Sequence, residues 1–118
     1  MKESAIERKL VTAVKKMGGL ALKFTSPGHA GVPDRIVIMP RGRIIFVELK
    51  TETGNLTPLQ IETHNRLRVL GVDVRTLYGK QYVEGFIHEL QTLAIPDNGL
   101  RPDPVAPQVR TFLGNGSR

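Results

Sequence analysis

The sequence predicts an α/β fold in the element order αβββαβα, with a mixed central sheet flanked by helices on both faces. Two apolar, β-branched runs within residues 36–49 are separated by a turn that contains Pro and Gly, which is typical of a β-hairpin. A later strand follows a segment with helical start and stop signals, so we expect it to return to the sheet through a crossover. The chain has 118 residues, and we expect one domain over residues 1–95.

The N-terminal segment predicts a helix followed by a short strand. Apolar residues recur with helical spacing from about Ala5 to Met17, and Gly18-Gly19 should end this helix. The run from Leu20 to Phe24 predicts the first strand. Residues 25–32 form a loop that contains Gly28, His29 and Gly31. Its glycines either let the backbone approach a phosphate or simply give flexibility before the hairpin.

The hairpin should contain one strand at about Ile36–Met39 and a second at Ile44–Leu49. Gly42 supplies the positive φ angle that a tight reversal between them needs. The second run is apolar on both of its faces, a pattern typical of a central strand covered on both sides. We therefore expect charged residues at its end to lie in a cleft.

The hairpin register decides on which face Asp34 lies, because side chains alternate along a strand. A three-residue loop would pair Met39 with Arg43 and place Asp34 opposite Glu48 on the same face. A two-residue loop at Arg41-Gly42 would place Asp34 on the other face. We predict the three-residue loop, since Arg-Gly is not one of the pairs that two-residue turns favour.

The second half of the domain predicts a helix, a strand and a final helix. Thr57 is a suitable N-cap, and Pro58 at the first helical position opens a helix that runs to about Leu70, where Gly71 ends it. Val72–Leu77 alternates like a strand, and Lys80–Leu93 has helical spacing.

Residues 96–118 differ in composition from the domain, since four of the eight prolines lie between Pro96 and Pro107. We expect a tail that is extended or mobile. A second interpretation is that the tail embraces a partner subunit through its apolar residues, which are Val105, Val109, Phe112 and Leu113.

Composition favours a polyanionic partner and excludes several other classes. The net charge is +6 and the pI about 10.1, which suits a phosphate backbone, although many basic proteins never bind nucleic acid. Aromatic residues make up only 5% and Trp is absent, so duplex or branched DNA fits better than a platform that stacks single-stranded bases. Each candidate DNA contact is, taken singly, better explained as a solvated side chain: Lys15, Lys16, Lys23, His29, Arg41, Arg43 and Lys80.

The absence of cysteine excludes disulfides, thiolate zinc sites and a Cys nucleophile, and it is consistent with a reducing cytosol. The three histidines are too scattered for a recognisable metal-ligand pattern. No P-loop is present, so we expect no nucleotide cofactor. We find no secretory signal and no apolar run of membrane-spanning length, and we expect a cytoplasmic protein of a bacterial or phage-infected cell with no membrane partner.

The candidate catalytic residues are Asp34, Glu48 and Lys50, at the ends of the paired strands. Two carboxylates can hold a hard divalent cation through oxygen, and an ammonium group beside them can orient water or stabilise charge at a phosphate. The alternative is that these charges merely mark where the sheet reaches solvent. The predicted burial of the second strand favours a site.

The order Gly31-Val32-Pro33-Asp34, Phe46-Val47-Glu48-Leu49-Lys50 and Thr57-Pro58-Leu59-Gln60 resembles the VRR-NUC (virus-type replication-repair nuclease) family of the PD-(D/E)XK nuclease superfamily. The resemblance covers roughly residues 4–90 and implies a restriction-endonuclease-like core. It implies that Asp34, Glu48 and the backbone carbonyl of Leu49 ligate Mg²⁺ or Mn²⁺, and that Lys50 assists the water that hydrolyses DNA. It also implies a homodimer that acts on branched DNA, such as a four-way (Holliday) junction, in replication, repair or recombination.

Two further positions match the family, and each also has a local explanation. Glu7 lies three residues after Ser4 and Gln60 three after Thr57, so each pair could form a capping box. Glu7 also flanks the apolar stripe of its helix, and could add a carboxylate to the metal site or support it. The resemblance places Gln60 beside the catalytic lysine.

Two other functions remain open at this point. One is a DNA-binding module that retains the nuclease fold without catalysis. The other is a sequence-specific, restriction-type endonuclease.

Overall fold

The computed structural model describes residues 3–93, and the predicted tail lies outside the described residues. The predicted order αβββαβα is confirmed. The helices and strands are α1 (Glu3–Lys16), β1 (Leu20–Lys23), β2 (Arg35–Met39), β3 (Arg43–Lys50), α2 (Pro58–Val69), β4 (Val74–Tyr78) and α3 (Gly79–Leu93), with one 3₁₀ turn, η1 (Pro40–Gly42), between β2 and β3.

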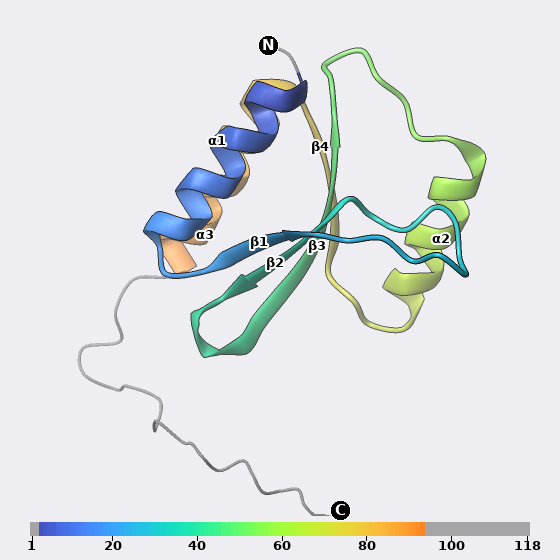
Figure 1. Ribbon diagram of the computed structural model, residues 1–118, viewed down its shortest axis with the longest axis horizontal. Helices are drawn as coiled ribbons and strands as arrows, with labels where there is room; N and C mark the ends of the chain where they lie inside the picture. The colour runs from blue at the N-terminus through green and yellow to red at the C-terminus, as the bar shows by residue number, and fades with distance from the viewer. Residues whose placement is uncertain (1–2, 94–118) are drawn as a thin grey trace, which may run out of the picture.

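The four strands form one mixed sheet in the order β1-β2-β3-β4. The first three strands are antiparallel neighbours, and β4 lies parallel to β3 after the crossover through α2. Helices α1 and α3 lie together on one side of the sheet, and α2 lies on the other (Figure 1). The predicted mixed sheet flanked by helices is therefore confirmed.

The hydrophobic core lies between the sheet and the pair α1 and α3. The apolar stripe of α1 repeats every four residues, so one face of this helix is completely shielded from solvent. Alternate residues of β2 and β3 point to the same core. Its fully buried members include Ile6, Leu10, Val14, Val37, Ile45, Val47 and Val83.

The opposite side of the sheet is covered only in part, by α2. The register places six apolar side chains there: Leu20 pairs with Ile38 and Ile38 with Ile44, while Leu22 pairs with Ile36 and Ile36 with Phe46. We call Leu20, Leu22, Ile36, Ile38, Ile44 and Phe46 the open apolar face. Leu20 is 55% exposed, Leu22 46% and Ile44 49%.

The expectation that the second hairpin strand is covered on both sides is therefore wrong at its start. An apolar pattern on both faces does not reveal how far a helix extends across the sheet. Only the end of β3 that carries Glu48, which is 3% exposed, is covered on this side.

The β2–β3 turn has the predicted three-residue loop, because Met39 pairs with Arg43. Gly42 has the expected positive φ of 79°, and Arg41 precedes it with a φ of 74°. A left-handed conformation costs a residue other than glycine roughly 1–2 kcal/mol. The packing of the hairpin outweighs this local preference.

Element boundaries differ from the expectations by a few residues. Thr57 is the N-cap of α2, with the predicted capping box to Gln60. The strand β4 begins at Val74 and not at Val72, because the Val72 amide donates to the Leu67 carbonyl at the end of α2, and Gly71 has a φ of 93°. Within residues 3–93 no helix is long and apolar enough to cross a bilayer.

Candidate active site

The predicted site residues meet where β2 begins and β3 ends, on the side of the sheet that carries α2. Arg35 pairs with Val47, so the next step along the antiparallel register places Asp34 opposite Glu48. Lys50 lies two residues further along β3, on the same face as Glu48. The structure thus brings Asp34, Glu48 and Lys50 together as the three-residue loop predicts.

Asp34 is held by backbone contacts from two different strands. Its carbonyl oxygen accepts a hydrogen bond of 2.8 Å from the Phe24 amide, which continues the pairing of β1 with β2. Its side-chain Oδ2 accepts one of 2.9 Å from the Leu49 amide. The first contact fixes the backbone of Asp34, and the second holds its carboxylate beside the end of β3.

The Glu48 carboxylate is contacted differently at its two oxygens. Oε2 accepts a hydrogen bond of 3.2 Å from Gln60 Nε2 and lies 3.8 Å from Lys50 Nζ. Oε1 lies 3.7 Å from His64 Nε2, and has no hydrogen-bond partner within residues 3–93. One oxygen is therefore held in place and the other is not.

Burial and the neighbouring charge of Asp34 raise the pKa of Glu48 to about 7, and the charge of Lys50 opposes this rise. Two carboxylates at one place repel each other, and one lysine does not fully compensate them. A bound cation would remove this repulsion.

Gln60 forms the capping box and, with the same side chain, contacts Glu48. Its Oε1 accepts a hydrogen bond of 2.9 Å from the Thr57 amide, which completes the capping box. The Nε2 of the same amide group donates to Glu48. The start of α2 therefore fixes a side chain that orients the buried carboxylate.

His64 is a site residue that the sequence reasoning missed. It lies one helical turn after Gln60 on α2, is 0% exposed and faces Glu48. Burial and the positive charge of Arg68 lower the pKa of His64, so its imidazole is neutral near pH 7. The four-residue spacing from Gln60, which places both side chains on one face of α2, was the available signal.

Glu7 lies against the other side of the sheet. Its Oε2 is 3.3 Å from Arg35 Nη2, and the Arg35 side chain alternates to the face opposite Glu48. Arg35 also donates to the Ala21 carbonyl. The local alternative does not hold, since Ser4 lies inside α1 and not at an N-cap. A role for Glu7 at or near a metal stays a prediction.

Gly31 lets the loop before Asp34 pack against α2. Its φ is 85°, and a Cβ at this position would lie 2.8 Å from the Leu59 carbonyl oxygen and from Thr63 Oγ1. Thr63 Oγ1 donates to the Ala30 carbonyl at 3.1 Å. This glycine therefore serves a close approach between two protein segments.

Within residues 3–93, no group of three or more His, Cys, Asp and Glu side chains is arranged to hold a metal.

The candidate DNA contacts are spread over several elements. Lys15 and Lys16 lie in the last turn of α1, Lys23 ends β1, and Arg41 is at the hairpin tip. Arg43 lies 3.6 Å from Asp73 Oδ2 and 3.8 Å from Glu89 Oε2, so this side chain already has acidic partners. Lys80 is paired with Glu84 at 3.9 Å, and His29 is exposed in the loop before Asp34.

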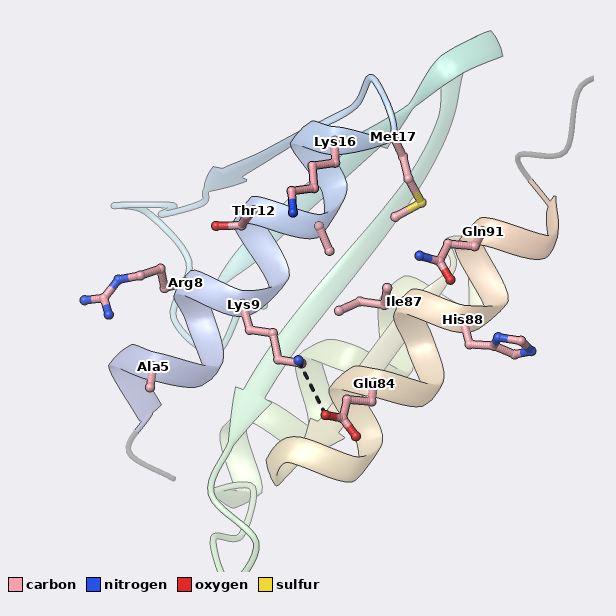
Figure 2. A pocket seen from close by; sticks show the side chains of 11 residues that line it. Ala5, Arg8, Lys9, Thr12, Lys16, Met17, Glu84, Ile87, His88 and Gln91 are labelled. Carbon is pink, nitrogen blue, oxygen red and sulfur yellow. Dashed lines mark ion pairs between the residues drawn. The ribbon is translucent and has the colours of Figure 1, made fainter.

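A groove lies between α1 and α3 (Figure 2), the two helices that cover the side of the sheet away from Glu48. Lys9 and Glu84 form an ion pair of 3.4 Å across it, and Lys16 and Met17 line one end. The groove contains none of the residues that meet at the ends of β2 and β3. It is therefore separate from the candidate active site.

Comparisons with known proteins agree with the fold and with a nuclease family. A model of the VRR-NUC domain matches residues 2–81. The protein named "Putative nuclease p44", from Acyrthosiphon pisum secondary endosymbiont phage 1, is 51% identical over 77 residues, which are 65% of this chain and 83% of that protein. A solved structure described as a VRR_NUC domain is similar with a TM-score of 0.69 at 33% identity, over 73% of this chain and 94% of that chain. The chain belongs to the VRR-NUC family of nuclease domains.

Proposed function

We propose that the protein is a metal-dependent DNA endonuclease that hydrolyses phosphodiester bonds. The observation that carries this proposal is the meeting of Asp34 and Glu48 beside Lys50, in a site where one carboxylate is almost fully buried. Family membership supports the nuclease reaction. The metal and the roles of individual residues are argued from the site.

The donor atoms of the site fit Mg²⁺ or Mn²⁺. Mg²⁺ in proteins is held by one or two carboxylates and keeps several waters, so a cluster of three acidic or histidine ligands is not needed. The Leu49 amide points to Asp34. Because the N–H and C=O of one strand residue point to the same side, the Leu49 carbonyl also points to the Asp34 side. Asp34, Glu48 and this carbonyl would hold the cation.

Each residue has a part that follows from its position. When bound, the cation would act as a Lewis acid that polarises the phosphate and lowers the pKa of a bound water. Lys50 holds its ammonium 3.8 Å from Glu48 Oε2, where it can orient the attacking water and stabilise charge that develops on the phosphoryl oxygens. Gln60 keeps Glu48 in place through its hydrogen bond.

The proposal predicts that cleavage requires a divalent cation. Labelled linear, flap and four-way DNA should be cut with Mg²⁺ or Mn²⁺, and chelation should reduce cleavage to the level without protein. Restoring the cation in excess should restore the cuts, which controls for damage by the chelator. Cleavage that continues undiminished in excess chelator would contradict the metal requirement.

The same assay separates the alternative functions. Binding without cleavage under every metal condition would indicate a non-catalytic DNA-binding module. Cuts that follow one short sequence in linear duplexes would indicate a restriction-type enzyme, and cuts that follow the branch point would support the proposed preference for branched DNA.

Exposed basic residues at the hairpin and at the end of α1 are suitable for contacts to the phosphate backbone.

We further propose that the open apolar face joins two copies of the chain. Three of its aliphatic side chains are about half exposed, and contiguous apolar surface of this kind commonly marks an interface. Phe46 lies on the same face as Glu48, two residues away in β3, so the patch borders the active site. A dimer formed through this face would carry two sites flanking one interface, which suits paired cuts in a branched substrate.

Ile44→Glu should convert the dimer to a monomer. An unpaired carboxylate buried in an interface costs several kcal/mol, so we expect the dimer dissociation constant to rise roughly 100-fold or more. Sedimentation equilibrium over a range of protein concentrations measures this change. Val69→Glu on α2 is the matched control, since Val69 is 86% exposed and lies outside the open apolar face. A dimer that survives Ile44→Glu and dissociates with Val69→Glu would place the interface on α2 instead.

A further inference from the structure

The proposed mechanism leaves the buried imidazole of His64 unexplained. The ring is 0% exposed, and neither of its nitrogens makes a well-formed hydrogen bond within residues 3–93, although the Gly31 backbone lies close enough to act on the pKa of the ring. Oε1 of Glu48 is likewise buried without a partner in that part of the chain. An unpaired buried polar group costs about 1–3 kcal/mol, and buried polar atoms normally find partners. Three such atoms in one place call for a functional explanation.

Two of these three unpaired atoms lie close to each other. His64 Nε2 lies 3.7 Å from Glu48 Oε1, only slightly beyond hydrogen-bond distance. The other oxygen, Oε2, is already contacted by Gln60 and Lys50. Only one oxygen of the carboxylate is held, so the orientation of the whole group is not fixed. Hydrogen bonds in active sites are often long before ligands bind, and they shorten in the loaded state.

We propose that His64 is a positioning residue whose Nε2–H donates to Glu48 Oε1 and fixes the orientation of the carboxylate for metal binding. This inference rests on the proposed metal-dependent nuclease function. The ring then carries a hydrogen on Nε2. Groups that orient a ligating carboxylate typically change metal affinity or activity 10- to 100-fold when they are removed, although they never touch the metal.

Two other roles for His64 agree less well with the contacts. A purely structural core histidine would be expected to pair a ring nitrogen with the protein in good geometry, and neither nitrogen does so, although the Gly31 backbone lies near the ring. A direct ligand would require the cation between Nε2 and Oε1, where both atoms are shut off from solvent, whereas Mg²⁺ keeps several waters. Donation to the carboxylate needs only a small approach of two atoms that already face each other.

The test compares two substitutions that differ in one hydrogen-bond donor. His64→Gln places an amide N–H near the position of Nε2, and His64→Leu fills similar space without a donor. We expect His64→Leu to raise the Mn²⁺ dissociation constant about 10-fold or more in calorimetric titration without DNA, with no loss of thermal stability. His64→Gln should stay within about 3-fold of the unmodified protein. Paramagnetic resonance of bound Mn²⁺ should show no directly coordinated nitrogen.

The outcomes separate this inference from the proposed function. If the unmodified protein binds Mn²⁺ and cuts DNA, but His64→Leu does both equally well, His64 is only structural and the inference is overturned. A nitrogen coupling in the Mn²⁺ spectrum that is lost together with affinity in both variants would show that His64 is a ligand. This result would also overturn the inference. If the unmodified protein neither binds Mn²⁺ nor cuts any DNA, the proposed function fails first and this inference falls with it.

Discussion

Asp34→Asn should abolish DNA cleavage, with a loss on the order of 10³-fold, while DNA binding is largely kept. The substitution removes one of the two charges that would hold the cation, but an amide oxygen can still accept the hydrogen bond from the Leu49 amide. The local structure should therefore survive. Lys50→Ala should act in the same direction, because it removes the ammonium beside Glu48. Initial cleavage rates on a labelled four-way junction and a filter-binding assay measure the two effects.

Glu62→Gln is the matched control for Asp34→Asn. It also removes one negative charge, but Glu62 is exposed on α2. We expect its cleavage rate to stay within about 2-fold of the unmodified protein, as is usual for surface substitutions. Equal losses in Glu62→Gln and Asp34→Asn would mean that net charge, and not the site, governs the rate.

In the absence of metal, the Glu48 carboxyl should lower the free energy of unfolding as the pH rises from about 5 to 8, while His64, whose pKa is lowered, contributes in the opposite direction. The pKa of Glu48 is raised from 4.5 to about 7 in the folded state, mainly by burial and then by Asp34. At this group the folded state therefore binds more protons than the unfolded state between these two values, and its contribution to the free energy of unfolding falls as the pH rises through this window. A shift of this size corresponds to about 3 kcal/mol, present below the unfolded pKa and lost above about pH 7.

Urea unfolding at several pH values, with Glu48→Gln in parallel, measures this loss. The variant carries no titrating group at position 48, so its stability should change less over the same window. Adding Mg²⁺ or Mn²⁺ at pH 8 should stabilise the unmodified protein, because a ligand that binds only the folded state shifts the equilibrium towards it. Parallel pH curves for the two proteins would show that Glu48 is not the group that titrates.

The order of elements and the hairpin register followed from local chemistry. Pro40 and Gly42 mark a turn, and the choice of a three-residue loop was enough to place Asp34 opposite Glu48. The cap at Thr57 was equally local, since the capping box depends on residues three positions apart. Patterns confined to a few neighbouring residues were therefore sufficient for these features.

Some features that depend on contacts between distant segments were not predicted. His64 and Glu48 are 16 positions apart, and only the packing of α2 onto the end of β3 brings them together. The pairing of Glu7 with Arg35 likewise depends on which side of the sheet α1 covers. The exposure of Ile44 reflects the limited extent of α2, which an apolar pattern within one strand cannot report.

The left-handed pair Arg41-Gly42 ties the length of the hairpin to the chemistry at its other end. Deleting or inserting one residue at this tip would shift the register of β2 against β3 by one residue. The Asp34 carboxylate would then lie on the face of the sheet that α1 and α3 cover. Residue types at the tip can therefore diverge among descendants of this chain without moving Asp34, whereas a one-residue shift of the register cannot be tolerated. The connection at residues 51–57 follows both acids in the sequence, and it can lengthen or shorten without changing which face either of them occupies.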